Sequence, residues 1–139
     1  MQIYRNILVA IDRSPVDEVL IGHVAALAAQ VGARVHLLHV VHSHTLDQER
    51  ALREQAAAAL EHYREVLSKE GIGVDVHIRS GEPDREILQE VEEGAYDLLV
   101  MAPHGHNLLG QILFGSVSRS LRRKIRIPLL LVRGDQQID

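Results

Sequence analysis

Near its N-terminus the chain reads Ile7-Leu8-Val9-Ala10-Ile11, five consecutive apolar residues that end at Asp12. A short continuous apolar run is typical of a strand buried on both faces of a parallel sheet. The next segment, residues 17–31, carries apolar side chains at helical spacing, with Ser14-Pro15 before it and Gly32 after it. A buried strand followed by an amphipathic helix predicts the first unit of an α/β fold.

The alternation of strand and helix continues along the rest of the chain. Residues 74–79 alternate strictly between apolar and polar, which indicates a strand with one wetter face at the edge of a sheet. A glycine-containing loop at residues 103–116 precedes the last helix and the last strand. The other strands are predicted at residues 35–41, 98–102 and 128–133, and the other helices at residues 52–67, 83–91 and 117–125.

These elements predict an α/β fold in one domain that spans residues 1–139. The chain has 139 residues, 46% of them hydrophobic, which is enough for a single buried core. Right-handed crossovers between parallel strands lead to an open, doubly wound, five-stranded parallel sheet in the order 3-2-1-4-5. Open α/β sheets bind ligands outside the carboxyl ends of the strands, where the strand order reverses. Asp12 and the loop at residues 103–116 are therefore expected to line a ligand site.

Glycines recur in this loop at Gly105, Gly110 and Gly115, and Ser116 follows at the predicted start of a helix. Glycines let backbone N–H groups approach an anion, and a helix N-terminus adds unpaired N–H groups and the positive end of its dipole. The pattern favours a phosphate site. The alternative interpretation is that Gly115-Ser116 only caps the helix and that the other glycines only form turns.

Composition excludes several classes of protein. Fifteen Lys and Arg against nineteen Asp and Glu give a net charge of −4, and four aromatic residues are too few for a base-stacking platform, so nucleic-acid binding is disfavoured. The chain has no cysteine, which excludes disulfides and thiol chemistry. No apolar run approaches the roughly 20 residues of a membrane span, and no signal-peptide pattern is present. We expect a cytoplasmic protein that does not bind membranes.

Five segments follow one another along the chain: Ile7 to Asp12 with Ser14, Leu38-His39-Val40, Gly81-Glu82-Pro83, Asp97 to Met101, and His104-Gly105 to Gly115-Ser116-Val117. Together they resemble the universal stress protein family over nearly the whole chain. The resemblance implies a Rossmann-like three-layer sandwich of the adenine-nucleotide alpha-hydrolase type. ATP-binding members carry Gly, two residues, Gly, nine residues, Gly and then Ser or Thr. Gly105, Gly115 and Ser116 match this pattern, and Ala102 replaces the first glycine.

The resemblance implies an adenine nucleotide as ligand, in the first instance ATP, with or without Mg²⁺. Asp12 would lie near the ribose, the base or a metal ion, and Val40 would meet the adenine through its backbone. Ala102 serves at its position if only a small residue is needed there, but its methyl group would interfere if the position requires a positive φ. We expect binding to be retained. The implied contact residues are Ala10, Asp12, Val40, Met101, Ala102, Gly105, Gly115, Ser116 and Val117.

Asp12 also has a purely structural interpretation, because an Asp before Ser14-Pro15 can cap the turn after a strand. The pairs His42/His44 and His104/His106 allow a zinc hypothesis, with solvated loop histidines as the simpler alternative. We therefore assign no metal site.

Three functions follow as hypotheses. The first is a nucleotide-responsive dimeric regulator of the stress response that acts on an unidentified protein partner. The second is a nucleotide-free dimeric interaction protein, and the third is a weak ATPase or phosphotransferase. The sequence has no Walker A lysine motif, no G-x-S-x-G and no H-E-x-x-H, so we assign no catalytic residue and expect slow ATP hydrolysis at most. The apolar last strand, residues 128–132, would lie at a sheet edge, which together with the resemblance predicts a homodimer through this strand.

Overall fold

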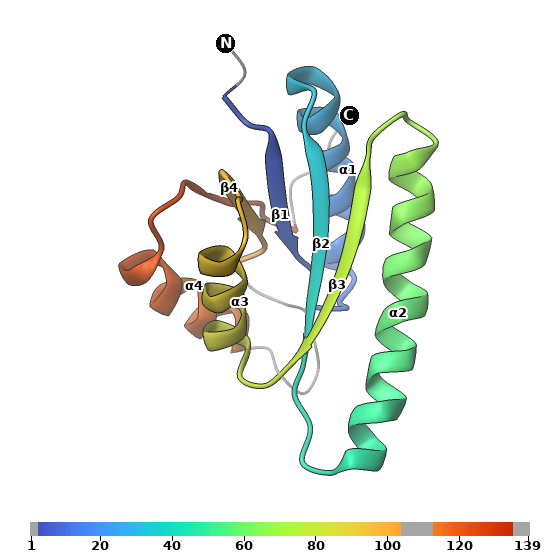
Figure 1. Cartoon of the computed structure of the whole chain (residues 1–139), viewed down its shortest axis with the longest axis vertical. Coiled ribbons are helices and arrows are strands. Elements are labelled where there is room, and N and C mark those ends of the chain that lie inside the picture. The colour runs from blue at the N-terminus through green and yellow to red at the C-terminus, as the bar shows by residue number, and fades with distance from the viewer. Residues whose placement is uncertain (1–2, 104–112, 135–139) are drawn as a thin grey trace.

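The computed structural model describes residues 3–103 and 113–134, and within them it has the predicted three-layer α/β architecture (Figure 1). Five parallel strands form one sheet in the order β3-β2-β1-β4-β5, which confirms the predicted order. The elements in chain order are β1 (Asn6–Ala10), α1 (Val16–Val31), β2 (Arg34–Val41), α2 (Leu46–Ser68), β3 (Val74–Ser80), α3 (Pro83–Glu93), β4 (Leu98–Met101), α4 (Leu113–Lys124) and β5 (Leu129–Leu131).

The core consists of two apolar clusters, one on each face of the sheet. Ile7 and Val9 of β1 face α1 and α2, whereas Leu8 between them faces α3 and α4. All three side chains are fully buried. The strand alternation thus places apolar side chains in both layers, and each buried side chain of this size contributes roughly 1.5–3 kcal/mol. This explains why β1 is the uninterrupted apolar run that the sequence contains.

Helix α1 ends where the sequence predicts. Gly32 adopts φ 71°, and its N–H donates to the carbonyl of Ala28 at 2.8 Å. This left-handed cap is a conformation that glycine adopts at little cost. The chain then turns directly into β2 at Arg34.

Helix α4 begins earlier than the sequence predicts. It starts at Leu113, so Gly115 and Ser116 lie within its first turn and not ahead of it. Leu113, Val117 and Leu121 are spaced four residues apart, and this spacing continues the helical pattern toward the N-terminus. The prediction was wrong because it read Gly115 as a loop residue.

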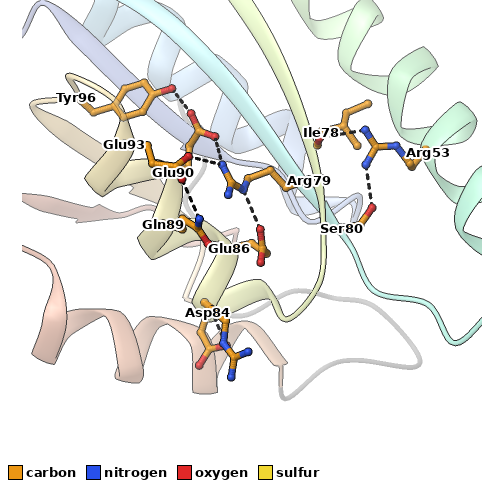
Figure 2. A network of polar contacts seen from close by, with 11 residues as sticks. Arg53, Ile78, Arg79, Ser80, Asp84, Glu86, Gln89, Glu90, Glu93 and Tyr96 are labelled. Atoms are coloured by element: carbon orange, nitrogen blue, oxygen red, sulfur yellow. Dashed lines mark hydrogen bonds and ion pairs between the residues drawn. The ribbon is translucent and has the colours of Figure 1, made fainter.

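Strand β3 forms the edge that its alternating pattern predicts. Val74, Val76 and Ile78 pack against the cluster under α1 and α2. On the opposite face, the guanidinium of Arg79 contacts three carboxylates of α3, those of Glu86 at 2.9 Å, Glu90 at 3.0 Å and Glu93 at 3.2 Å (Figure 2). The Tyr96 hydroxyl donates to Glu90 at 2.6 Å, which adds a neutral donor to the same cluster. The edge strand is therefore joined to α3 by charge and not by apolar contact.

Candidate functional site

The reversal of strand order lies at β1, which has β2 on one side and β4 on the other. Val9 of β1 pairs with Val100 of β4, and Ala10 pairs with Leu38 of β2. The loop from β1 leads to α1 on one face of the sheet, and the chain from β4 leads to α4 on the opposite face. The loop from β1 into α1 therefore begins at the point where this architecture binds ligands.

The chain leaves β1 in a fixed conformation. The N–H of Ile11 donates to the Leu38 carbonyl at 2.8 Å, and His39 Nδ1 lies 2.7 Å from the Ile11 carbonyl oxygen. A carbonyl oxygen only accepts hydrogen bonds, so His39 carries its proton on Nδ1. Burial lowers the pKa of His39, which favours the neutral ring. His39 is a half-buried residue of β2.

One oxygen of the Asp12 carboxylate forms the predicted turn after β1. Asp12 Oδ1 accepts the N–H of Ser14 at 3.1 Å, and Arg13 between them has φ 64°. A non-glycine residue in the left-handed region carries strain that the surrounding hydrogen bonds must offset. Asp12 Oδ2, in contrast, is buried and has no hydrogen-bond donor among the described residues. The turn thus leaves one acceptor oxygen without a donor at the end of β1.

Asp17, the second residue of α1, lies beside Asp12 and is the functional candidate that the sequence analysis missed. Its side chain is 2% exposed, and its Oδ1 accepts the N–H of Asp12 at 3.3 Å. Burial, followed by the charge of Asp12 and a hydrogen bond with its side chain, raises the pKa of Asp17 to about 8. A signal was present, because Asp17 occupies the apolar stripe of α1 three residues before Leu20.

The small residues at the ends of β1 and β4 offer main-chain groups. Ala10 and Met101 are buried and pack in the cluster under α3 and α4, so their side chains are not free to contact a ligand. Ala102 directly after β4 is also buried. Arg13 is the single non-glycine residue with positive φ in the described part of the chain, so Ala102 has an ordinary backbone conformation. This position therefore does not need a glycine to adopt a positive φ.

The remaining predicted contact residues lie on β2, on α4 and in the loop before it. Val40 is half-buried near the carboxyl end of β2 and pairs with Arg79 of β3. Gly115, Ser116 and Val117 are in the first five residues of α4. Gly105 lies outside the described residues.

The histidines do not assemble a metal site in the described part of the chain. His42 Nδ1 lies 3.4 Å from the Gly81 carbonyl oxygen, and the ring of His44 packs edge-on against that of His42. Within residues 3–103 and 113–134 no group of three or more His, Asp and Glu side chains could hold a metal ion. His104 and His106 lie outside these residues. None of the described helices is long and apolar enough to cross a membrane.

The strand order defines an open α/β protein with its topological switch point at β1, where proteins of this architecture bind ligands. The model of the universal stress protein family matches residues 3–133, and the chain belongs to this family.

Solved structures and sequence relatives agree with this assignment. The structure of the Methanocaldococcus jannaschii protein MJ0577 superimposes with a TM-score of 0.80, at 29% identity, over 99% of each chain. By sequence the universal stress protein MJ0577 is 27% identical over 94% of this chain and 95% of its own. The universal stress protein YxiE of Bacillus subtilis is 26% identical over 94% of this chain and 99% of its own. A family member from Archaeoglobus fulgidus in complex with dAMP has a TM-score of 0.71 at 25% identity, covering 93% and 98% of the two chains.

Proposed function

We propose that the protein binds an adenine nucleotide at the carboxyl ends of β1 and β4, beside Asp12. The observation that carries the proposal is the Asp12 carboxylate, which is fixed by the Ser14 N–H and retains a buried oxygen without a donor. A carboxylate has about four acceptor positions, so a ribose hydroxyl or the adenine amino group can donate to Asp12 in addition to the Ser14 N–H. Membership of the universal stress protein family and the dAMP complex of the Archaeoglobus relative support an adenine nucleotide over other ligands.

In this proposal the ligand contacts mainly backbone groups of the protein. Val40 contacts the adenine through its backbone, and Ala10, Met101 and Ala102 border the ribose with their main-chain groups. The phosphates bind at the loop with Gly105 and at the first turn of α4, where Gly115, Ser116 and Val117 are located. We propose ATP as the principal ligand, with Mg²⁺ bound through its phosphates, as nucleotide-associated Mg²⁺ usually is.

Ala102 is compatible with this proposal. Its backbone conformation does not require glycine, and its methyl group is already buried. An Ala102→Gly variant should therefore bind ATP within about threefold of the parent. A large gain in affinity from this substitution would mean that the methyl group obstructs the phosphates.

The test is calorimetric titration of nucleotide-stripped protein with Mg-ATP, Mg-AMP and Mg-GTP. Saturable binding of the adenine nucleotides, lost in a Gly115→Val variant and weakened in Asp12→Ala, is the expected result. Gly22→Ala is the matched control, because Gly22 lies in helix α1 and an added Cβ would meet nothing within 4 Å. No binding up to millimolar ATP would refute the proposal.

We further propose that the protein is a homodimer that regulates a protein partner in the cytoplasm. Among the described residues strand β5 pairs with β4 alone, and Leu129, Leu130 and Leu131 are half-buried. An apolar edge strand of this kind tends to be covered by another chain. The segment 128–132 of a second copy is the covering element that we propose. If nucleotide binding fails, this edge remains the surface on which the function would depend.

A further inference from the structure

Asp12 and Asp17 form a buried pair of carboxyl groups at the proposed nucleotide site. Asp17 Oδ1 accepts the Asp12 N–H at 3.3 Å, and both the charge and the side chain of Asp12 act on the Asp17 carboxyl group to raise its pKa. Asp17 is almost completely buried, and Asp12 Oδ2 has no donor among the described residues. Two ionised carboxylates in such a position repel each other, whereas one proton between them makes a hydrogen bond.

The proton resides on Asp17 at neutral pH. Its pKa is raised to about 8, chiefly by burial and then by the Asp12 charge. A protonated Asp17 supplies the donor that Asp12 lacks. A carboxylate has about four acceptor positions, so Asp12 keeps lone pairs for a ligand after it accepts from Ser14 and from Asp17.

We propose that Asp17 is a positioning residue of the nucleotide site: when protonated, its carboxyl group donates to the Asp12 carboxylate and fixes its orientation, and when ionised it removes this support. This inference rests on the proposed function, because it assigns the orientation of Asp12 to a second residue. It predicts that nucleotide binding and the protonation of the pair are coupled. Affinity then falls as pH rises through the range in which Asp17 ionises.

Two other titratable groups near the Asp12–Asp17 pair, His39 and Tyr63, keep their charge in this range. Burial lowers the pKa of His39 on β2, so its ring is neutral above pH 7. Tyr63 on α2 is also neutral there, because burial and the charge of Asp17 raise its pKa. Arg13 and Glu18 are exposed, and the Arg13 guanidinium reaches Gln55 Oε1 at 3.5 Å. A change in affinity between pH 7 and pH 9 would therefore report on the Asp12–Asp17 pair.

The experiment measures the dissociation constants of AMP and adenosine between pH 7.0 and pH 9.5, for the wild type and for Asp17→Asn. AMP keeps its phosphate charge through this range, since the second phosphate pKa is about 6. In the wild type, affinity for both ligands should fall above about pH 8, approaching tenfold per pH unit. In Asp17→Asn it should stay constant, because the amide donates to Asp12 at every pH. The matched control is Glu18→Gln, which removes a neighbouring exposed charge and should keep the wild-type profile.

A second measurement needs no variant. Titrations of wild-type protein with AMP at pH 8, in buffers of different ionisation enthalpy, should reveal proton uptake on binding. A wild-type affinity that does not change with pH, or zero proton uptake, would overturn the role of Asp17. A fall for AMP without one for adenosine would also overturn it, since simple repulsion of phosphate would then suffice. Absence of AMP binding at pH 7 would instead overturn the proposed function itself, and with it this inference.

Discussion

The carboxyl pair makes a prediction for the stability of the protein without any ligand. The perturbation is Asp17→Asn, which keeps the shape of the side chain, the acceptor for the Asp12 N–H and a donor toward Asp12, but cannot ionise. Because the folded-state pKa of Asp17 lies near 8 and its ordinary value is 3.8, the folded chain binds more protons than the unfolded chain between these values. The stabilising contribution is fully present below pH 3.8 and is lost as pH rises through about 8.

The magnitude follows from this difference. Each pH unit between the two pKa values lowers the free energy of unfolding of the wild type by on the order of 1 kcal/mol relative to Asp17→Asn. Between pH 5 and pH 8 the free energy of unfolding of the variant should therefore rise by several kcal/mol relative to that of the wild type. Urea unfolding of both proteins at pH 5, 6, 7 and 8 measures the difference, and all other titrating groups cancel in it. Glu18→Gln, with its exposed side chain, should parallel the wild type.

A constant difference between wild type and Asp17→Asn across this range would refute the reasoning. It would mean that Asp17 is ionised in the folded protein at pH 5 already. A folded-state pKa below the ordinary value would give the same constant difference, because Asp17 would then be ionised in both the folded and the unfolded chain above pH 5.

Three other predictions concern packing, backbone conformation and association. Leu60→Ala removes a fully buried side chain from α2 and should cost about 2–5 kcal/mol in urea unfolding, whereas Leu46→Ala in the same helix, where the leucine is 82% exposed, should change stability by less than about 0.5 kcal/mol. In α1, Gly22→Ala should stabilise the protein by up to about 1 kcal/mol, because an added Cβ meets no atom within 4 Å. At the C-cap of α1, where φ is 71°, Gly32→Ala should destabilise it by about 1–2 kcal/mol. The two variants should shift the melting temperature in opposite directions. Leu131→Lys on β5 should convert a dimer to a monomer in sedimentation velocity at micromolar concentration, and an unchanged sedimentation coefficient would contradict association through β5.

Much of the fold could be predicted from the sequence because the strands differ in burial. Residues 7–11 and 98–102 lack polar side chains since both faces of β1 and β4 are covered by helices. Residues 74–79 alternate between apolar and polar side chains because one face of β3 packs against the apolar cluster. The other face carries Arg79, which contacts glutamates of α3. These differences place β3 at an edge, whereas the apolar sequence of β5 does not reveal that it forms the other edge.

The site was less predictable, and Asp12 and Asp17 show why. Asp12 stands at the end of an apolar run, where the sequence marks it. Its predicted role in the turn is confirmed, and one of its oxygens has no donor among the described residues. Asp17 is five residues away on the next element, and its unusual protonation depends on burial by neighbouring side chains that no local pattern encodes. The start of α4 was misplaced for a related reason, because glycine was taken as a local signal although helical spacing continued through it.

The two edges of the sheet are chemically different, and this difference limits how large an assembly can become. One face of β3 carries Arg79, which contacts glutamates of α3, and near the start of β3 Asp75 is paired with Arg34 at 2.7 Å. β5, at the other edge, consists of three leucines. If two copies meet through β5 by a two-fold axis, as proposed, their β5 edges are used up and their β3 edges lie on the two outer sides. Such a pairing terminates itself: the sheet can double in width, but it cannot grow into a filament.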